Sequence, residues 1–298
     1  MSFHIVVGAG ATGIATALLL AGSGERVRLV TRGGSGPEHP LVERVALDAA
    51  DAAALTEAAR GAATVFNAAA PAYHTWPTTL PPLFRAVLSA AEHAGADYVM
   101  LGNLYGYGPV DGPLTEDLPL LATGPKGEVR ARMWREAEAA HRAGRVRVTE
   151  VRAGAFLGTG AVSWFTLLVE PHVRAGRPAL VQGRPDVPHG FTAVADVAAA
   201  LLAVSRGDRA WGRAWHAPVT NATAQEAAAV LAEAAGAPAP RLAGMTDREL
   251  TLLGLTSPLW NELWEIAYMT DRPFVVDSSG IEDAFGLKPT PLEEVFAG

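Results

Sequence analysis

Three glycines near the N-terminus have the spacing Gly8-x-Gly10-x-x-Gly13, with Ala11 and Thr12 before the last of them. An apolar run at residues 5–7 precedes the glycines, and a helical run at residues 14–20 follows. In such a turn the first glycine permits a tight bend, the second lets a pyrophosphate approach the backbone, and the third lets helix and strand pack closely. Free N–H groups at the helix start favour phosphate. The spacing therefore predicts a dinucleotide site, and the alternative is a purely structural turn.

The segment after the second apolar run indicates which dinucleotide is bound. Residues 27–30 are followed by Thr31 and Arg32, and no acidic residue lies between Glu25 and Glu38. A site for NAD offers Asp or Glu about 20 residues past the glycines, whereas an arginine there accommodates a 2′-phosphate. We therefore predict NADP(H) rather than NAD(H), with Arg32 at the 2′-phosphate. The alternative is an ordinary surface arginine in a glycine-rich loop.

The pattern around these residues predicts an α/β fold. Short β-branched runs alternate with Ala- and Leu-rich stretches up to Gly108, which indicates a Rossmann-type, doubly wound parallel sheet with crossover helices. We expect strands at residues 4–7, 27–30, 42–46, 64–67, 98–101 and 146–152, and helices at 13–21, 50–60, 80–93 and 129–142. Frequent glycine and proline after Arg152 predict a smaller C-terminal substrate lobe. We expect a cofactor-binding core at 1–155 and a lobe at 156–298, with 190–218 returning to the core sheet.

Composition excludes several classes of partner and site. The chain has 298 residues, 49% apolar residues and a net charge of −7, which suits one large core with a smaller lobe. A negative charge without a basic patch argues against nucleic acid. The absence of cysteine excludes disulfides and thiolate sites, and no His, Asp or Glu spacing matches a metal site. The N-terminal run is too short for a signal peptide or membrane span, so we expect a cytoplasmic protein with no membrane partner.

Several segments in order along the chain resemble the NAD(P)-dependent epimerase/dehydratase branch of the short-chain dehydrogenases. They are Leu47-Asp48, Val65-Phe66-Asn67-Ala68-Ala69-Ala70, Tyr105-Gly106-Tyr107-Gly108-Pro109 with Leu114-Thr115-Glu116, Val151 to Gly158, His189 to Val197, and Val276 to Ser279 with Leu287-Lys288-Pro289. The resemblance implies that Asp48 contacts adenine and that Ala68, Ala69 and Ala70 pass under the cofactor. It also implies a homodimer through the helices at 80–93 and 129–142.

The catalytic residues depart from that resemblance. The family implies a Ser-Tyr-Lys set, in which tyrosine moves the carbinol proton, yet the chain contains no Tyr-x-x-x-Lys. Lys126 stands in the place of the tyrosine and Arg130 in that of the lysine, while the serine position falls on Leu101 or Asn103. Burial at a helix start favours a neutral amine, so Lys126 could act as general acid or base. A lysine in this region that takes over from the tyrosine is similar to the arrangement in the isoflavone-reductase and NmrA-like branches. The alternatives are an exposed lysine, or one that only binds the cofactor.

Other side chains are candidates for catalysis or for the substrate wall. Tyr105 and Tyr107 follow the fifth strand, where open α/β sheets place ligands, and either could supply a phenol. Asn103 could hydrogen-bond a substrate carbonyl or the nicotinamide amide, and the alternative is a turn residue beside glycine. We expect the substrate to contact Tyr73, His74, Trp76, Phe156, Trp164 and His189. The spacing of four between Trp260, Trp264 and Tyr268 predicts one face of a helix; if these rings line the pocket, the substrate is apolar or contains a ring.

Three functions follow from these residues. The first is an NADP(H)-dependent oxidoreductase that transfers hydride to or from a small or medium organic carbonyl, imine or alkene. The second is a nucleotide-sugar epimerase or dehydratase, which shares the fold but normally needs the missing set. The third is a non-catalytic NADP(H) sensor, for which the loss of Ser-Tyr-Lys is the main argument.

Overall fold

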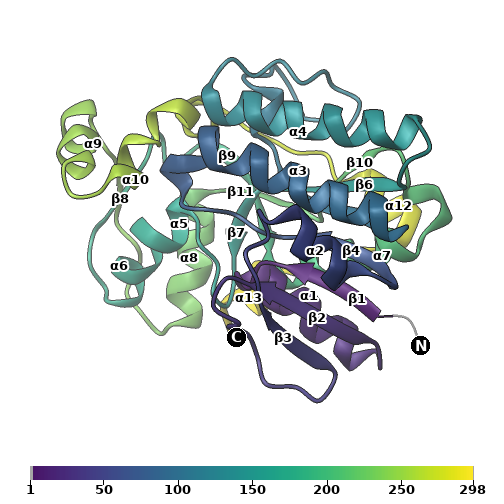
Figure 1. Cartoon of the computed structure of the whole chain (residues 1–298). Coiled ribbons are helices and arrows are strands. Elements are labelled where there is room, and N and C mark those ends of the chain that lie inside the picture. The colour runs from purple at the N-terminus through teal and green to yellow at the C-terminus, as the bar shows by residue number, and fades with distance from the viewer. Residues whose placement is uncertain (1–2, 298) are drawn as a thin grey trace.

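A parallel sheet of seven strands runs through the part of the chain that the computed structural model describes, residues 3–297 (Figure 1). The strand order is β3-β2-β1-β4-β5-β6-β10. The strands are β1 (Phe3–Val7), β2 (Arg26–Thr31), β3 (Val42–Ala46), β4 (Ala62–Asn67), β5 (Asp97–Asn103), β6 (Val148–Ala153) and β10 (Ala214–His216). Strand β1 is buried on both faces, with Ile5, Val6 and Val7 at most 1% exposed, as parallel strands between helices require. The predicted doubly wound sheet is confirmed.

Helices cover both faces of this sheet. Helices α1 (Ala11–Gly22) and α7 (Val194–Arg206) pack on one face, and α2 (Ala52–Ala59), α3 (Trp76–Ala94) and α4 (Pro125–Arg142) pack on the other. Helices α3 and α4 begin four residues before the predicted starts, at Trp76 and Pro125. Both early starts place a proline in the first turn, where its missing N–H costs no hydrogen bond.

The C-terminal part of the chain forms smaller units beside the sheet. Strands β7 (Ala155–Leu157), β9 (Pro188–Ala193) and β11 (Thr220–Thr223) make one small sheet, and β8 (Ala179–Val181) pairs with β12 (Leu242–Gly244). The accompanying helices are α5 (Trp164–Leu168), α6 (Glu170–Arg174), α8 (Ala224–Ala234), α9 (Asp247–Gly254) and α13 (Leu292–Ala297). Helix α12 (Ser279–Phe285) packs instead against α7 and against β10 of the central sheet. Within the predicted return segment, α7 and β10 join the central sheet, whereas β9 belongs to the small sheet. We retain the division at residue 155 as a proposal.

The segment at residues 258–271 differs from the prediction of one helix. It consists of α10 (Pro258–Asn261), the 3-10 turn η4 (Trp264–Ile266) and α11 (Tyr268–Asp271). Trp264 is 44% exposed, so the three predicted rings do not share one buried face. The breaks let Leu263 and Ile266 pack inward while Glu262 and Glu265 both reach Lys126. Tertiary contacts thus override the helical period. No helix within residues 3–297 has the length and apolar character needed to cross a bilayer.

Candidate active site

The glycine turn forms an open cradle at the start of α1. Gly8 has a φ of +100°, and a Cβ there would lie 2.8 Å from Ala69 Cα, while a Cβ on Gly13 would lie 1.9 Å from the carbonyl oxygen of Gly8. A Cβ on Gly10 would meet nothing within 4 Å. No side chain caps the helix at Gly10, so its first N–H groups face this space. Two glycines therefore serve packing, and the third leaves room for a phosphate, which fits a dinucleotide.

The residues predicted to contact the rest of the dinucleotide lie at the same edge of the sheet. Arg32 is the first residue after β2 and its side chain is exposed. Asp48 follows β3, is also exposed, and accepts a hydrogen bond of 3.0 Å from the N–H of Ala50. Ala68 and Ala69 follow β4 and touch the glycine turn. The carboxyl ends of β1, β2, β3 and β4 thus carry the predicted cofactor residues together.

A buried ion cluster lies at the start of α4. Lys126 is 1% exposed, and its ammonium group pairs with the carboxylates of Glu262 and Glu265, the latter at 3.1 Å. The second oxygen of Glu265 accepts the N–H groups of Lys126 at 2.7 Å and Gly127 at 3.3 Å. Glu265 therefore binds both the lysine side chain and the unpaired end of the helix. The alternative of an exposed Lys126 is wrong, and its side chain is paired with two carboxylates.

Sequence reasoning missed Glu262 and Glu265. The available signal was a pair of carboxylates three residues apart in a segment otherwise rich in apolar and aromatic residues, where an unpaired charge is costly. Such a pair needs a cationic partner, but nothing in the sequence says that this partner is Lys126, more than 130 residues earlier. Among residues 3–297, no group of three or more His, Asp or Glu side chains is arranged to hold a metal ion.

Tyr105 lies beside this cluster, in the 3-10 turn η2 (Tyr105–Tyr107) that follows β5. Its hydroxyl lies 3.1 Å from that of Tyr73, which belongs to η1 (Tyr73–Thr75) after β4 and donates the hydrogen bond. Burial raises the pKa of the Tyr105 phenol, while the hydrogen bond from Tyr73 and the positive charges of Arg130 and Lys126 act in the opposite direction. The structure thus joins a phenol and two cations that belong to separate segments.

The two cations are held in place by different contacts. The Lys126 ammonium lies 4.9 Å from the centre of the Tyr73 ring, in addition to its two carboxylate partners. The Arg130 guanidinium lies 4.3 Å from the centre of the Trp76 ring, and its Nη1 donates to the carbonyl oxygen of Leu101 at 3.3 Å. Trp76 therefore supports Arg130. The sequence predicts a different role for it, as part of the substrate wall.

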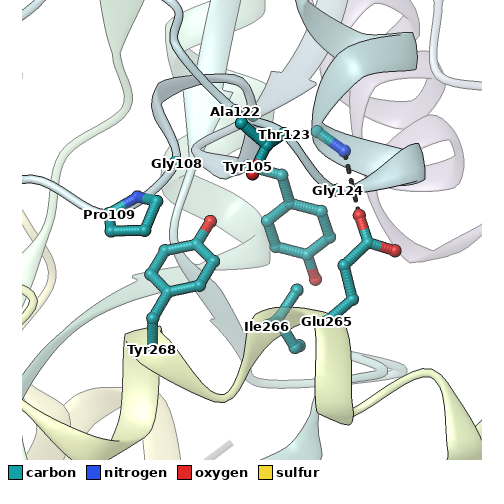
Figure 2. Close-up of a pocket in the computed structure, with 10 residues that line it drawn as sticks. Tyr105, Gly108, Pro109, Ala122, Thr123, Gly124, Glu265, Ile266 and Tyr268 are labelled. Atoms are coloured by element: carbon teal, nitrogen blue, oxygen red, sulfur yellow. Dashed lines mark hydrogen bonds between the residues drawn. The ribbon is translucent and has the colours of Figure 1, made fainter.

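A cavity of about 210 Å³ opens beside Tyr105 (Figure 2). It lies between η2, the start of α4 and the segment from Glu265 to Tyr268. We call it the tyrosine pocket, and its lining residues are Tyr105, Gly108, Pro109, Ala122, Thr123, Gly124, Gly127, Glu265, Ile266 and Tyr268. Figure 2 shows Tyr105 between Tyr268 on one side and Glu265 on the other. Of the predicted site residues, Tyr105 is the one that lines this pocket.

Tyr107 and Asn103 have other contacts. The buried Tyr107 hydroxyl accepts a hydrogen bond of 2.6 Å from Arg152 and lies 2.7 Å from Nε2 of His216. Arg152 in turn pairs with the buried Glu150 at 2.7 Å. Tyr107 thus belongs to a network inside the fold, and we leave it out of the proposed catalytic set. The side-chain oxygen of Asn103 accepts the N–H of Tyr105 at 3.2 Å, as a turn residue does.

The remaining substrate candidates do not gather at the tyrosine pocket. His74 is exposed on η1. His189, on β9, is 4% exposed, and its ring lies 5.3 Å from that of Trp164. Burial lowers the pKa of His189 to about 4, and within the described residues its Nε2 has no hydrogen-bond partner. Phe156, on β7, packs against the core cluster beneath α7. Their role as substrate contacts stays a prediction.

Comparison with known proteins shows which family the chain belongs to. Residues 4–214 match the model of the NAD dependent epimerase/dehydratase family. The chain belongs to this family. The expected resemblance is thus confirmed. The placement of Lys126 and Arg130 at the tyrosine and lysine positions of this epimerase/dehydratase family member stays a prediction from the sequence. No curated protein matches the chain.

Solved structures similar to this family member share its fold over nearly the whole chain. MoeE5 in complex with UDP-glucuronic acid and NAD is 21% identical with a TM-score of 0.78, covering 99% of this chain and 97% of the other. The UDP-glucose 4-epimerase of Thermotoga maritima with UDP-glucose is 16% identical, with a TM-score of 0.78 and coverage of 100% and 96%. DesIV, the dTDP-glucose 4,6-dehydratase of Streptomyces venezuelae, with NAD and TYD bound, is 19% identical, with a TM-score of 0.77 and coverage of 100% and 95%.

Proposed function

We propose that the protein binds NADP(H) and catalyses hydride transfer at an alcohol or carbonyl carbon of a small organic substrate, with Tyr105 as the proton-transfer group. The observation that carries this proposal is the phenol of Tyr105 beside the two cations Lys126 and Arg130. The same pairing of phenol and cation underlies the Ser-Tyr-Lys chemistry that the family resemblance implies. Here the phenol belongs to η2 and the cations to α4.

The position of Tyr105 suits a reaction beside a bound dinucleotide. Strands β1, β4 and β5 are neighbours in the sheet, so the segments that follow them meet at one edge. The glycine turn after β1 touches Ala69 after β4, and Tyr73 after β4 is hydrogen-bonded to Tyr105 after β5. Ligands of open α/β sheets bind at this carboxyl edge. A continuous series of contacts therefore joins the phosphate cradle to the phenol.

The bound dinucleotide would supply or accept the hydride. In the reducing direction, the Tyr105 hydroxyl gives its proton to the substrate oxygen as the carbonyl becomes an alcohol. In the oxidising direction, the Tyr105 phenolate takes the hydroxyl proton as the carbinol C–H bond breaks. The positive charges of Lys126 and Arg130 favour the phenolate, whereas burial and the Glu265 carboxylate oppose it and keep the pKa of Tyr105 raised. Lys126 thereby acts through Tyr105, as a positioning and electrostatic group.

A second candidate function is epimerisation or dehydration of a nucleotide sugar. Family membership favours it, as do solved neighbours that are described as a UDP-glucose 4-epimerase and a dTDP-glucose 4,6-dehydratase. The proton transfer that we assign to Tyr105 would serve this function as well. Net consumption of nucleotide distinguishes the two, since an epimerase returns the hydride that it removes.

The preference for NADP(H) rests on Arg32. Its exposed side chain follows β2, where a 2′-phosphate would lie, and no acidic residue lies within the stretch between Glu25 and Glu38. The structural neighbours MoeE5 and DesIV are described with NAD. A cytoplasmic location and a homodimer through α3 and α4 stay predictions from the sequence.

The test is a turnover assay with a matched pair of variants. We expect the purified protein to consume NADPH with members of a panel of carbonyls, imines and enones; UDP-glucose and dTDP-glucose are incubated in parallel and analysed for sugar interconversion. Tyr105→Phe should lower kcat by about 100-fold or more, the size of a general-acid contribution, with nucleotide affinity unchanged. Tyr73→Phe removes only a hydrogen bond to that phenol and should cost far less.

Three results would decide against parts of this proposal. Full turnover by Tyr105→Phe would remove that phenol from the mechanism. Sugar interconversion without loss of NADPH would establish the second candidate function. Tight binding of NADPH with no turnover in either assay would leave a nucleotide-binding sensor.

A further inference from the structure

The charged side chain that lines the tyrosine pocket is the carboxylate of Glu265. The ammonium group of Lys126 pairs with this carboxylate and also with that of Glu262. None of the ten lining residues is a lysine, an arginine or a histidine. Arg130 is buried over the ring of Trp76 and is not among the lining residues. A substrate in the pocket therefore meets the Glu265 carboxylate and no cationic side chain among the lining residues.

The positive end of α4 does not offset this charge for a ligand. The N–H groups of Lys126 and Gly127, which an anion would otherwise accept from, already donate to Glu265. Figure 2 shows one of these bonds as the dashed line from the Glu265 carboxylate. An anionic substrate group would thus find the helix end occupied and would be repelled by the carboxylate that occupies it.

Two aromatic rings complete a site for a cation. Tyr105 and Tyr268 both line the pocket, and Figure 2 shows their rings side by side, with Glu265 next to Tyr105. The face of a phenol ring attracts a cation within about 6 Å of its centre, most strongly where water is excluded. Burial raises the pKa of Tyr268, so its ring stays an uncharged phenol at neutral pH.

The volume of the pocket limits the size of the ligand that can carry a positive charge into it. Its volume of about 210 Å³ exceeds by a modest margin the roughly 150 Å³ of a cavity that accepts benzene. One small ring with a substituent fills such a space. A nucleoside diphosphate does not fit within it.

We propose that the tyrosine pocket binds the protonated amine of a small, ring-containing substrate, against the rings of Tyr105 and Tyr268 and the carboxylate of Glu265. This rests on the proposed function, because the amine-bearing ring is held where its alcohol or carbonyl group can reach the Tyr105 phenol. The expected substrates are therefore cyclic amino alcohols and amino ketones. The Glu265 carboxylate disfavours a substrate phosphate in this pocket.

Calorimetry on the full chain saturated with NADPH tests the proposal without relying on turnover. The probes are cyclohexylammonium chloride and cyclohexanol, which share a ring and differ in charge. We expect the ammonium to bind about tenfold more tightly than the alcohol, as a desolvated cation–π contact with a carboxylate partner would give. Glu265→Gln should lower that preference by about fivefold, because an amide keeps the helix cap and loses the charge. Glu233→Gln, exposed on α8, is the matched control and should leave it unchanged.

Further variants keep the test decisive. Should Glu265→Gln fail to fold, Glu262→Gln removes the other carboxylate that pairs with Lys126, which lowers the negative charge near the pocket and leaves the helix cap in place. Tyr268→Leu should weaken ammonium binding, and Tyr268→Phe should retain it, because the ring face is what attracts the cation. Equal affinities for the two probes, no binding of either at millimolar concentration, or equal effects of Glu265→Gln and Glu233→Gln would overturn the ammonium site. Failure of the preceding NADPH titration would instead refute the proposed function, so the two failures are distinguishable.

Discussion

Alanine at Gly10 should weaken nucleotide binding and alanine at Gly13 should lower stability, although only two residues lie between these glycines. Gly10 has φ −72° and ψ 176°, which alanine adopts freely, and a Cβ there meets nothing within 4 Å. We therefore expect Gly10→Ala to change the free energy of unfolding by less than about 1 kcal/mol. The new methyl group would occupy the space in front of the helix N–H groups. Loss of one charge-assisted hydrogen bond to a phosphate costs about 1.5–3 kcal/mol, or roughly 10–100-fold in NADPH affinity.

Gly13→Ala should act on stability first. Its Cβ would lie 1.9 Å from the carbonyl oxygen of Gly8, so α1 and the turn must separate by about 1 Å or more. Overpacking of this kind costs about 1–3 kcal/mol and lowers Tm by roughly 2–4 °C for each kcal/mol. Gly22→Ala, at the other end of α1 with nothing near its Cβ, is the control for both variants.

The assay is a thermal melt of each variant, followed by titration with NADPH and NADP+ in a calorimeter. We expect Gly10→Ala to have normal stability and weak nucleotide binding, and Gly13→Ala to have low stability. Wild-type affinity in Gly10→Ala would show that no pyrophosphate lies on this turn. The proposed cofactor site would then be wrong, even though the fold would stand.

Three further predictions concern single side chains. Arg32→Ala should weaken NADPH binding by about tenfold and leave NADH binding unchanged, so an unaltered affinity ratio would contradict the 2′-phosphate contact. Because burial lowers the pKa of His189 to about 4, the unfolded chain takes up a proton near pH 6.5 that the folded chain refuses, and stability should fall by about 3 kcal/mol as pH drops from about 6.5 to about 4. His189→Phe should flatten this dependence in urea titrations, whereas the exposed His74→Phe should not. Tyr107→Phe should cost about 1–3 kcal/mol in urea unfolding, since it leaves the buried Arg152 without one acceptor, and should leave NADPH affinity unchanged.

Most strands of the central sheet could be predicted from sequence because their signal is local. Six of the seven contain a short apolar run with at least one β-branched residue, and β3 (Val42–Ala46) has the predicted bounds without change. The seventh, β10 (Ala214–His216), has no β-branched residue and is not among the predicted strands. Helix starts were less certain, since a proline is compatible both with a loop and with the first helical turn, as at Pro125. The segment at 258–271 has helical spacing, yet its structure depends on the distant Lys126, which no local pattern describes.

The cofactor half of the site was likewise more predictable than the catalytic half. Gly8, Gly10 and Gly13 act through the backbone of one short turn, so their spacing carries the whole argument. The catalytic candidates depend on which side chains share a cavity. Tyr105 and Tyr107 looked equivalent in sequence, but the turn between them sends one to the tyrosine pocket and the other to Arg152.

Gly127 explains how a phenol and two cations from different segments can meet. A Cβ at this position would lie 2.7 Å from the carbonyl oxygen of Tyr105 and 2.4 Å from Cβ of Ala122, so only glycine lets η2 pack directly on the first turn of α4. In a Tyr-x-x-x-Lys motif the helix itself sets the spacing of phenol and cation, because residues four apart lie on one face. Here packing of a loop against the helix sets it instead. The electrostatic pairing that the proposed chemistry requires is therefore compatible with this chain, although the linear motif that usually announces it is absent.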